Sequence, residues 1–467
     1  MTTNTDARGG DPANTDARAG EASGASAARA GDPTKSDAHA VETRSASADG
    51  ADANDRAAEV SGVSDARPDP LTTETAGDRT PMPGRVVYGV TIGGSAFSLL
   101  RGQLAWLRER GWDVRLVSSP DDEAHIAAER EDVRFYGLPM TRSITPIQDA
   151  IALRRWLKLL GKLKPAAINV GTPKAGLLGG VAGWLRRVPQ RLYVVRGLRI
   201  EGTRGPLSWV LWLTEWATMR VATDVLFVSP SLALEAQRRG LLDGRKSWAI
   251  GSGSSNGVLA HEVAARAGEV DRRELRERLG LGADDFVVGF VGRITYDKGV
   301  DQLIEAFGRV TDPRIRLLCI GEPEDEQLAA QVGVLGDRVR RVGYTSDLWG
   351  HLPAMDVLCL PTLREGFPNV VLEASSVGMP TITTRATGAV DSVIDGVTGL
   401  LFDVGDTDAL LRHIHTLAND WEKRERMGAA ARQRVLTEFQ PERIWSGVEE
   451  ILQGVAEPRV AHRVTGK

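Results

Sequence analysis

The sequence feature that most constrains the fold is a regular alternation of short apolar runs and amphipathic helical patterns that starts near residue 85. In the first series, Phe97, Leu100, Leu104 and Leu107 recur at the three-to-four spacing of a helix with one buried face. Strands are predicted at 86–92, 113–117, 166–170, 191–195 and 224–229, and further helices at 175–185 and 232–240. Strands and helices in turn favour a parallel sheet with helical crossovers.

A second alternating series follows residues 260–280, a charged stretch that we interpret as a weakly structured linker. Its predicted strands are 286–291, 316–320, 357–360 and 381–384, with helices at 300–310 and 369–377. The sequence therefore predicts an α/β protein with two Rossmann-like domains. Because open parallel sheets bind ligands at the carboxyl ends of their strands, two such domains would place a cleft between two rows of loops.

The first 83 residues differ from the rest of the chain in composition. They contain no Ile, Phe, Tyr or Trp, so they cannot bury enough apolar surface to offset the chain entropy lost on folding. We predict a disordered acidic tail at 1–83, an N-terminal Rossmann-like domain at 84–265 and a C-terminal one at 266–438. A C-terminal helix at 439–455 is expected to return towards the N-terminal domain.

The formal net charge of −4 conceals a strongly basic middle of the chain. Residues 84–270 carry 26 basic and 16 acidic side chains, net +10, whereas the segments before and after them are each net −7. This asymmetry favours an anionic partner: nucleic acid, anionic lipid or a phosphorylated substrate. The two cysteines lie in apolar runs, and neither a secretory signal nor an apolar span of 18 residues is found. These features favour a cytoplasmic protein.

The first motif that carries chemistry is the loop 292–299, Gly-Arg-Ile-Thr-Tyr-Asp-Lys-Gly, between a predicted strand and a predicted helix. Arg293 offers a planar fork of donors, and Lys298 offers a compact cation. Both would lie near a helix N-terminus, whose free N–H groups and dipole attract phosphate. The loop could bind a pyrophosphate, or it could be an ordinary basic loop.

The second motif is 365–373, Glu-Gly-Phe-Pro-Asn-Val-Val-Leu-Glu, which follows the predicted strand 357–360. Pro368 suits the first turn of a helix. Glu365 would then lie at the mouth of the helix, and Glu373 about a turn and a half inside it. The alternative for Glu373 is a buried capping or salt-bridged acid, which spacing alone does not exclude.

Together, these two motifs resemble those of the retaining glycosyltransferases of family 4, which have the two-domain GT-B fold. The stretches 172–179, 251–258 and 364–374 resemble the bacterial subset that extends polyprenyl-diphosphate-linked sugars in capsule, exopolysaccharide or glycan assembly. The resemblance covers about residues 85–455. It implies a nucleotide-diphospho-sugar donor, with UDP as the expected nucleotide, and a lipid-linked saccharide acceptor. It implies neither cofactor nor metal, because Arg, Lys and helix N-termini neutralise the leaving diphosphate.

The resemblance also implies roles for individual residues. Arg293 and Lys298 would hold the donor diphosphate. Glu365 would lie against the transferred sugar, and Glu373 would bind the ribose hydroxyls. The other donor-binding residues that the resemblance implies are Gly366, Phe367, Pro368, Asn369, Gly93 and Gly94.

The chain departs from the family pattern at Arg196, where many relatives have a His in a His-Gly-Leu motif. Arg cannot act as a base near neutral pH, although it could stabilise the leaving phosphate or the transferred sugar. We therefore expect Arg196 to be catalytic together with Arg293, Lys298 and Glu365. The residues expected on the acceptor side are Lys174, Arg199 and Glu201.

Trp209, Trp212 and Trp216 fall on one face of a predicted helix. A basic cluster precedes them at Arg154, Arg155, Lys158, Lys162 and Lys164. The two features predict either a buried stripe with a solvated charged face, or an interfacial patch that docks on an anionic membrane. A lipid-linked acceptor would require the second, and would make the protein peripheral on the inner face of the cell membrane.

The sequence thus favours a retaining hexosyl- or N-acetylhexosaminyltransferase. One alternative is a nucleotide-sugar 2-epimerase of the same architecture, which is disfavoured because the seven histidines lie outside these motifs. Another is a catalytically inactive sugar-nucleotide-binding scaffold, suggested by Arg196. A nucleic-acid binder would explain the basic middle of the chain but not the paired acids, so we expect no nucleic-acid partner.

Overall fold

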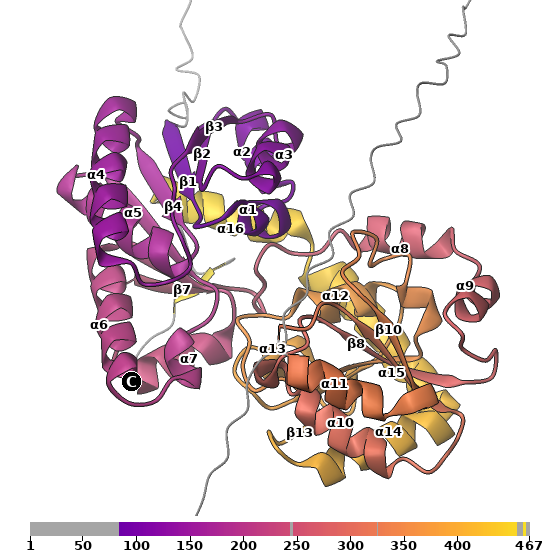
Figure 1. The fold of residues 1–467 in the computed structure, drawn as a ribbon. Coiled ribbons are helices and arrows are strands. Elements are labelled where there is room, and N and C mark those ends of the chain that lie inside the picture. The colour runs from indigo at the N-terminus through magenta and orange to yellow at the C-terminus, as the bar shows by residue number, and fades with distance from the viewer. Residues whose placement is uncertain (1–83, 243–245, 325, 455–460, 464–467) are drawn as a thin grey trace, which may run out of the picture. The chain divides into compact units, whose positions relative to one another are not determined.

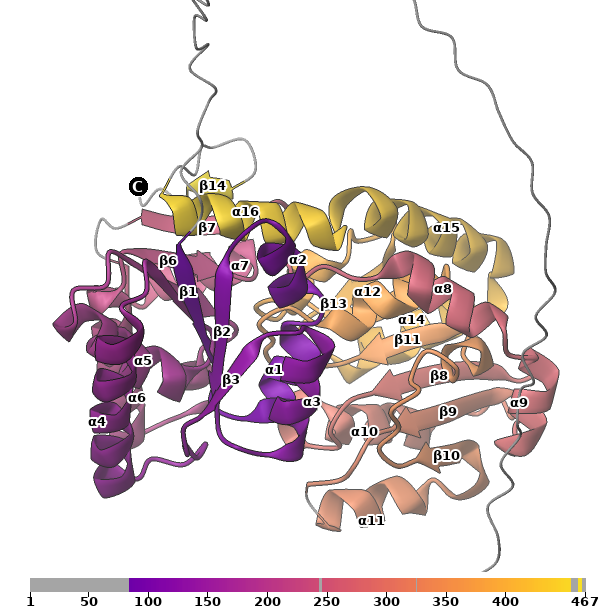
Figure 2. The ribbon, with the colours of Figure 1, turned by 90° about the horizontal axis from the view of Figure 1, so that it is seen from above.

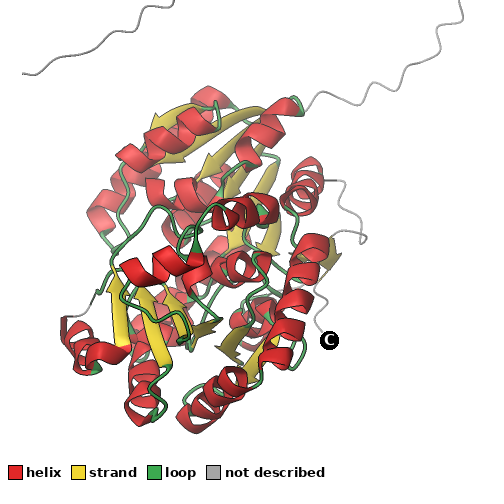
Figure 3. Cartoon of the chain, turned by 90° about the vertical axis from the view of Figure 1, so that its right-hand side faces the viewer, coloured by secondary structure: helices red, strands yellow, loops and turns green. Residues whose placement is uncertain are grey.

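A computed structural model describes residues 84–242, 246–324, 326–454 and 461–463 (Figure 1). The predicted disordered tail, 1–83, lies outside the described residues. The described part forms two sheets, which belong to one compact unit. Figure 3 shows helices on both faces of the strands, so that the strands are enclosed. The prediction of two Rossmann-like domains is therefore confirmed.

The first sheet has the strand order β14-β7-β6-β5-β4-β1-β2-β3, and its neighbouring strands are parallel except for β14 with β7. Its central strands are almost fully buried, as expected for apolar runs covered on both faces. The strands are β1 (Arg85–Gly89), β2 (Asp113–Ser118), β3 (Arg134–Gly137), β4 (Ala167–Val170), β5 (Gln190–Val195), β6 (Asp224–Phe227), β7 (Lys246–Ile250) and β14 (Ala461–Arg463). Its helices are α1 (Gly93–Leu99), α2 (Gln103–Glu109), α3 (Asp122–Arg130), α4 (Pro146–Leu163), α5 (Pro173–Leu185), η1 (Arg199–Gly202), α6 (Pro206–Val221) and α7 (Pro230–Arg238).

The second sheet has the order β10-β9-β8-β11-β12-β13, with every neighbouring pair parallel. Its strands are β8 (Phe286–Val291), β9 (Ile315–Ile320), β10 (Val339–Val342), β11 (Val357–Leu360), β12 (Thr381–Thr384) and β13 (Gly399–Phe402). The helices from α8 onwards are α8 (Ala260–Gly268), α9 (Arg272–Arg278), η2 (Tyr296–Lys298), α10 (Val300–Arg309), α11 (Glu326–Val334), η3 (Gly336–Arg338), η4 (Leu352–Ala354), α12 (Asn369–Ser376), α13 (Ala389–Ser392), α14 (Thr407–Asn419), α15 (Trp421–Glu438) and α16 (Pro441–Gln453).

One predicted helix is two in the structure. The apolar pattern 97–107 is broken between α1 and α2 at Gly102, which has a φ of 78° and precedes the first residue of α2. A Cβ atom at this position would lie 2.7 Å from the ring of Trp445, so the close approach of α16 also requires glycine. The helical spacing of apolar residues in the sequence runs through Gly102 without interruption. The break there is caused by the backbone conformation of Gly102 and by the packing of α16.

The predicted linker at 260–280 is wrong, because this stretch forms α8 and α9, and α8 packs against α12. Asp271 caps α9 by accepting from the N–H of Glu274. Arg276 is buried and pairs with Asp356 at 2.7 Å. At least one of the charged residues that suggested a linker, Arg276, instead helps to hold α9 against the elements of the second sheet.

The last helix, α16, contacts α2, β4 and β5, while α15 contacts α12 and β13 (Figure 2). The chain thus passes from the elements of the second sheet to those of the first at residues 439–440. The predicted domain bounds themselves stay predictions. No helix among the described residues is both long and apolar enough to cross a membrane.

Candidate active site

Lys298 and Glu365 form the closest ion pair of the two motifs, with 2.5 Å between Nζ and Oε1. Lys298 ends η2, directly after β8, and Glu365 lies in the loop between β11 and α12. Since β8 and β11 are neighbours in the second sheet, the loops at their carboxyl ends meet. Both side chains are largely buried, so water screens this pair less than a surface pair. The structure therefore joins the two motifs in one charged site.

Arg293 lies beside this pair but is engaged with other acids. Its Nη1 donates to Glu324 at 2.7 Å, and its Nη2 lies 3.7 Å from Asp297. The Glu324 hydrogen bond raises the pKa of the guanidinium, so Arg293 stays charged at any physiological pH. Arg364 also lies 3.7 Å from Asp297. Sequence reasoning assigned no role to Asp297, Glu324 or Arg364, although Asp297 and Arg364 belong to the quoted motifs.

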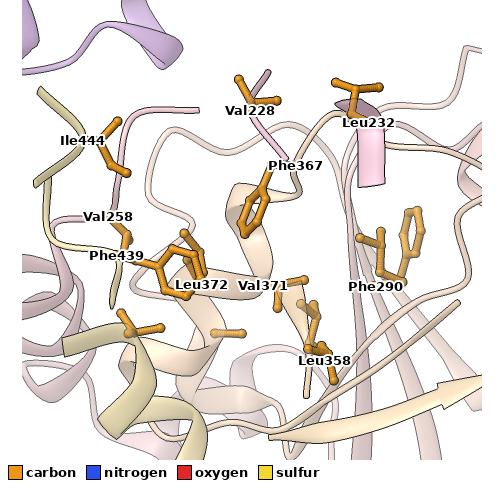
Figure 4. Close-up of a cluster of buried hydrophobic side chains, with 14 of the residues drawn as sticks. Val228, Leu232, Val258, Phe290, Leu358, Phe367, Val371, Leu372, Phe439 and Ile444 are labelled. Atoms are coloured by element: carbon orange, nitrogen blue, oxygen red, sulfur yellow. The ribbon is translucent and has the colours of Figure 1, made fainter. Parts of the chain in front are cut away.

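Besides its two glutamates, the second motif supplies a helix N-terminus. Pro368 precedes α12, whose first amides lack intrahelical acceptors. The ring of Phe367 is buried 5.6 Å from that of Phe439, and Figure 4 shows it within a cluster of apolar side chains. Only its backbone is thus free for a ligand. Among the described residues, the buried Oδ1 atom of Asn369 has no hydrogen-bond donor, so it is an open acceptor at the helix start.

Glu373 lies apart from the ion pair, one turn inside α12. Its Oε1 accepts from Nε1 of Trp349 at 3.1 Å, and burial raises the pKa of its carboxyl group. The guanidinium of Arg101 lies 5.1 Å from the centre of the Trp349 ring. A small pocket of about 70 Å³ is lined by Ser98, Arg101, Asn256, Gly257, Val258, Leu259, Trp349, Asn369, Glu373, Pro441 and Trp445.

Trp349, Arg101 and Asn256 around this pocket received no role from sequence reasoning. The amide of Asn256 donates to Arg101 O at 2.8 Å and accepts from Trp445 Nε1 at 2.8 Å. Asn256 lies in the stretch 251–258 that the sequence analysis singled out, which was the available signal. Trp349 offered none, because it lies in a loop that matches no motif.

Arg196 meets the second motif through its backbone. A Cβ atom on Gly366 would lie 2.1 Å from the carbonyl oxygen of Arg196, so the two chain segments are in direct contact only because residue 366 is glycine. The Arg196 side chain donates from Nη1 to the carbonyl of Ser255 at 2.9 Å. The predicted residues Arg196, Gly366, Glu365 and Lys298 are thus brought together.

Gly93 and Gly94 begin α1 rather than forming a free loop. The Gly93 N–H donates to Asp121 at 2.9 Å, and a Cβ atom on Gly94 would lie 2.6 Å from a carboxylate oxygen of Glu123. Two acidic side chains therefore occupy the space that the glycines leave. The structure places these glycines next to carboxylates, which is unfavourable for a diphosphate unless Asp121 and Glu123 move.

The predicted acceptor residues are placed in two locations. Lys174, at the start of α5, pairs with Asp149 at 2.6 Å and so ties α5 to the start of α4. Arg199 and Glu201 lie on η1; Arg199 is exposed, and burial raises the pKa of Glu201. A Cβ atom on the neighbouring Gly202 would lie 2.8 Å from Nε of Arg364, so η1 borders the charged site.

The fold defines the class of protein: two Rossmann-like domains with a cationic and acidic site at the carboxyl ends of their strands. A solved structure with this arrangement is that of Anabaena HepE in complex with UDP-glucose, with a TM-score of 0.66 and 20% identity. It matches 79% of this chain and 100% of that chain. At this identity the likeness shows the fold.

Sequence comparisons show the family. The family model for glycosyl transferases group 1 matches residues 271–434, and the model for the glycosyl transferase 4-like domain matches residues 96–246. The chain is 36% identical over 374 residues to the capsular polysaccharide biosynthesis glycosyltransferase CapM of Staphylococcus aureus, covering 79% of this chain and 96% of CapM. The chain therefore belongs to the glycosyltransferases of this family, as the motif resemblance implied.

The name of a further relative states both of its substrates. The UDP-Gal:alpha-D-GlcNAc-diphosphoundecaprenol alpha-1,3-galactosyltransferase of Escherichia coli is 27% identical over 302 residues, which is 62% of this chain and 76% of that enzyme.

Proposed function

We propose that this protein transfers a hexose or N-acetylhexosamine from a UDP-sugar to a lipid-diphosphate-linked saccharide in cell-surface polysaccharide assembly, with retention of anomeric configuration. The observation that carries the proposal is the Lys298–Glu365 pair beside Arg293 and the start of α12. The names of the relatives from S. aureus and E. coli support the polysaccharide context and the lipid-linked acceptor. UDP complexes of a structural neighbour support the donor nucleotide.

In the proposed reaction, the bond between C1 of the sugar and the diphosphate oxygen breaks, and an acceptor hydroxyl oxygen bonds to C1 on the same face. The acceptor proton passes to the departing diphosphate oxygen, so no protein base is required. Lys298 and Arg293 stabilise the negative charge that develops on the leaving group. Before the donor binds, Glu365 and Glu324 hold these two cations in place.

Glu365 and Glu373 take different roles in this proposal. When the diphosphate binds Lys298, Glu365 loses its partner and becomes a free acceptor for hydroxyl groups of the transferred sugar. Glu373 exchanges its hydrogen bond from Trp349 for ribose hydroxyl groups. Metal independence also belongs to the proposal: the cations of the site supply the charge neutralisation that a divalent ion supplies elsewhere.

A transfer assay tests the function directly. The full-length protein is incubated with cell membranes and a panel of radiolabelled sugar nucleotides, with and without EDTA. Labelled lipid-extractable product from a UDP-sugar, undiminished by EDTA, is expected. Conversion of the free sugar nucleotide to an epimer would instead support the 2-epimerase. An inactive scaffold would be supported if the protein binds UDP but shows none of three activities: transfer, epimerisation and slow donor hydrolysis.

We further propose that a face formed by α4 and α6 docks on anionic membrane. Helices α4, α5 and α6 lie side by side (Figure 1). The apolar side chains of this face, with exposed fractions as high as 79% for Ile147 and 74% for Trp209, are Ile144, Ile147, Ile151, Leu207, Trp209, Val210 and Leu213. Five exposed cations follow on or just after α4: Arg154, Arg155, Lys158, Lys162 and Lys164.

This face differs from the predicted tryptophan stripe. Trp212 donates to the carbonyl of Arg239 at 2.9 Å and stacks on Trp216, and both pack against the core. Of the three tryptophans, Trp209 alone is exposed. The other apolar side chains of the proposed face include Ile147 and Ile151, which are exposed on α4. Each exposed cation near an anionic surface contributes about 1 kcal/mol. Vesicle sedimentation should therefore show binding to anionic but not neutral vesicles, weakened by salt and by Ile147→Asp with Trp209→Asp. Equal binding to both vesicles, or to neither, would exclude the docking face.

A further inference from the structure

The guanidinium of Arg196 has no carboxylate partner among the described residues. Within the described part of the chain, its Nη1 donates to the carbonyl of Ser255 at 2.9 Å, and its buried Nε finds no acceptor there. The other cations of the site differ in this respect, since Lys298 pairs with Glu365 and Arg293 with Glu324. Unlike Lys298 and Arg293, Arg196 therefore has no acidic partner within the described part of the chain.

The surroundings of this guanidinium belong to the first sheet. Residue 171 follows β4 and is glycine, and a Cβ atom there would lie 3.1 Å from Nε of Arg196. Tyr88 on β1 also lies nearby, and its buried hydroxyl group interacts with Asn169 and with the charge of Arg196. The backbone carbonyl of Arg196, by contrast, faces Gly366 of the second motif. The side chain therefore lies on the first-sheet side of the contact, away from the helix start that would bind the donor diphosphate.

A cation in this position is unfavourable until an anion reaches it. Burial lowers the pKa of Arg196 to about 10, which still leaves the group charged near neutral pH. A buried charge without a partner is costly, and the cost is recovered when a hydrogen-bonded counter-ion is present. Because Nε is buried against Gly171, Nη2 is the guanidinium nitrogen that an oxygen of a carboxylate or phosphate can reach. Nη1 is already held by Ser255, so the guanidinium plane keeps a fixed orientation.

We propose that Arg196 binds an oxyanion of a substrate other than the donor diphosphate: either a carboxylate on the transferred sugar or a phosphate of the lipid-linked acceptor. The proposal rests on the proposed function, which places donor and acceptor at this site. It makes Arg196 a specificity-determining residue at the position where many relatives have a histidine. A neutral sugar and a neutral acceptor would leave the cation unpaired.

Titration calorimetry on the full-length protein tests the proposal with four probes: UDP, UDP-glucose, UDP-glucuronate, and farnesyl diphosphate added after saturation with UDP. The variants are Arg196→Gln, which keeps a donor for Ser255, and Arg196→Lys, which keeps the charge but loses the fork. For the wild type, we expect at least tenfold tighter binding of UDP-glucuronate than of UDP-glucose, or measurable binding of farnesyl diphosphate. Arg196→Gln should remove whichever is observed, and Arg196→Lys should restore part of it.

The controls separate this proposal from the proposed function. If wild-type protein fails to bind UDP, the proposed function is wrong. If Arg196→Gln weakens UDP binding as much as binding of the anionic probe, Arg196 belongs to the diphosphate site and the present proposal is wrong. It is equally wrong if the wild type shows no preference for either anionic probe. Thermal unfolding within about two degrees of wild type is required of each variant, with Arg196→Lys as the second variant should Arg196→Gln fail to fold.

Discussion

The Nζ atom of Lys298 lies 2.5 Å from Oε1 of Glu365, although 67 positions separate the two residues in the chain. Each belongs to one of the two motifs, and the adjacency of β8 and β11 brings them together. A donor diphosphate would compete with Glu365 for the ammonium group. We therefore expect donor binding to release Glu365 as an acceptor beside the transferred sugar, which couples the two motifs energetically.

Removing the cation should impair donor use. Lys298→Ala deletes a charged hydrogen-bond donor worth about 1.5 to 3 kcal/mol, which corresponds to a loss of about 10- to 150-fold in kcat/KM. Steady-state kinetics with the donor as varied substrate measures it. Arg314→Ala is the matched control, because Arg314 pairs with Asp312 at the surface outside the site, and it should retain activity. Near-wild-type turnover of Lys298→Ala would contradict the assignment.

Substitutions of Glu373 and Trp349 should have different effects on UDP affinity, because we expect Glu373 to bind the ligand and Trp349 to bind Glu373 only when the ligand is absent. Glu373→Gln keeps the shape but loses the carboxylate, so UDP affinity should fall about tenfold or more. Trp349→Phe removes the N–H that occupies Glu373 while keeping a ring beneath Arg101, so UDP affinity should hold or rise. Calorimetry with UDP distinguishes them. A fall in both variants would mean that the hydrogen bond maintains the site instead of competing with the ligand.

Gly366 should tolerate no side chain. The Cβ atom of Gly366→Ala would meet the backbone of Arg196 at 2.1 Å, and backbone cannot rotate away. We expect about 1 to 3 kcal/mol of destabilisation, the usual range for overpacking, together with a loss of transfer. Gly308→Ala is the control, since it lies within α10 with no heavy atom in the way and should be neutral or stabilising. Chemical denaturation of both variants gives the comparison. Equal stability would refute the close contact.

Glu215 should make stability depend on pH. Burial raises the pKa of its carboxyl group to about 7, and the group receives a hydrogen bond from Tyr193 at 2.9 Å. Between the unfolded pKa near 4.5 and about 7, the native state binds the extra proton, so stability falls as pH rises through this range. The loss should reach roughly 3 kcal/mol, at about 1.4 kcal/mol per pKa unit.

Glu215→Gln provides the matched comparison. The amide cannot ionise, so the unfolding free energy of the variant should vary less between pH 5 and pH 8. Its stability relative to wild type should rise with pH over the same interval. Urea unfolding at several pH values measures both proteins. Parallel pH profiles would show that Glu215 is ionised in the native protein throughout.

The sequence by itself determined the central strands, the two-domain architecture and the family, but not β3, β7, β10, β13 and β14. Apolar runs such as 286–291 and 357–360 reappear as β8 and β11 with unchanged bounds, because burial on both faces requires that composition. The family resemblance assigned both motifs to the donor, whereas the strand order that places β8 beside β11 comes from the structure. The pairing of Lys298 with Glu365 is the geometric outcome of that strand order.

Only the tertiary structure decided which charges are satisfied. The charged stretch 260–280 resembles a linker in the sequence, but in the structure Arg276 pairs with Asp356. The tryptophan stripe resembles a membrane-binding face, but Trp212 donates to a backbone carbonyl and packs inward. Local patterns set the period of an element, whereas long-range contacts set the partner of each polar group. For the same reason, no spacing in the sequence could reveal that the half-buried Arg196 would have no carboxylate partner among the described residues while Lys298 and Arg293 have theirs.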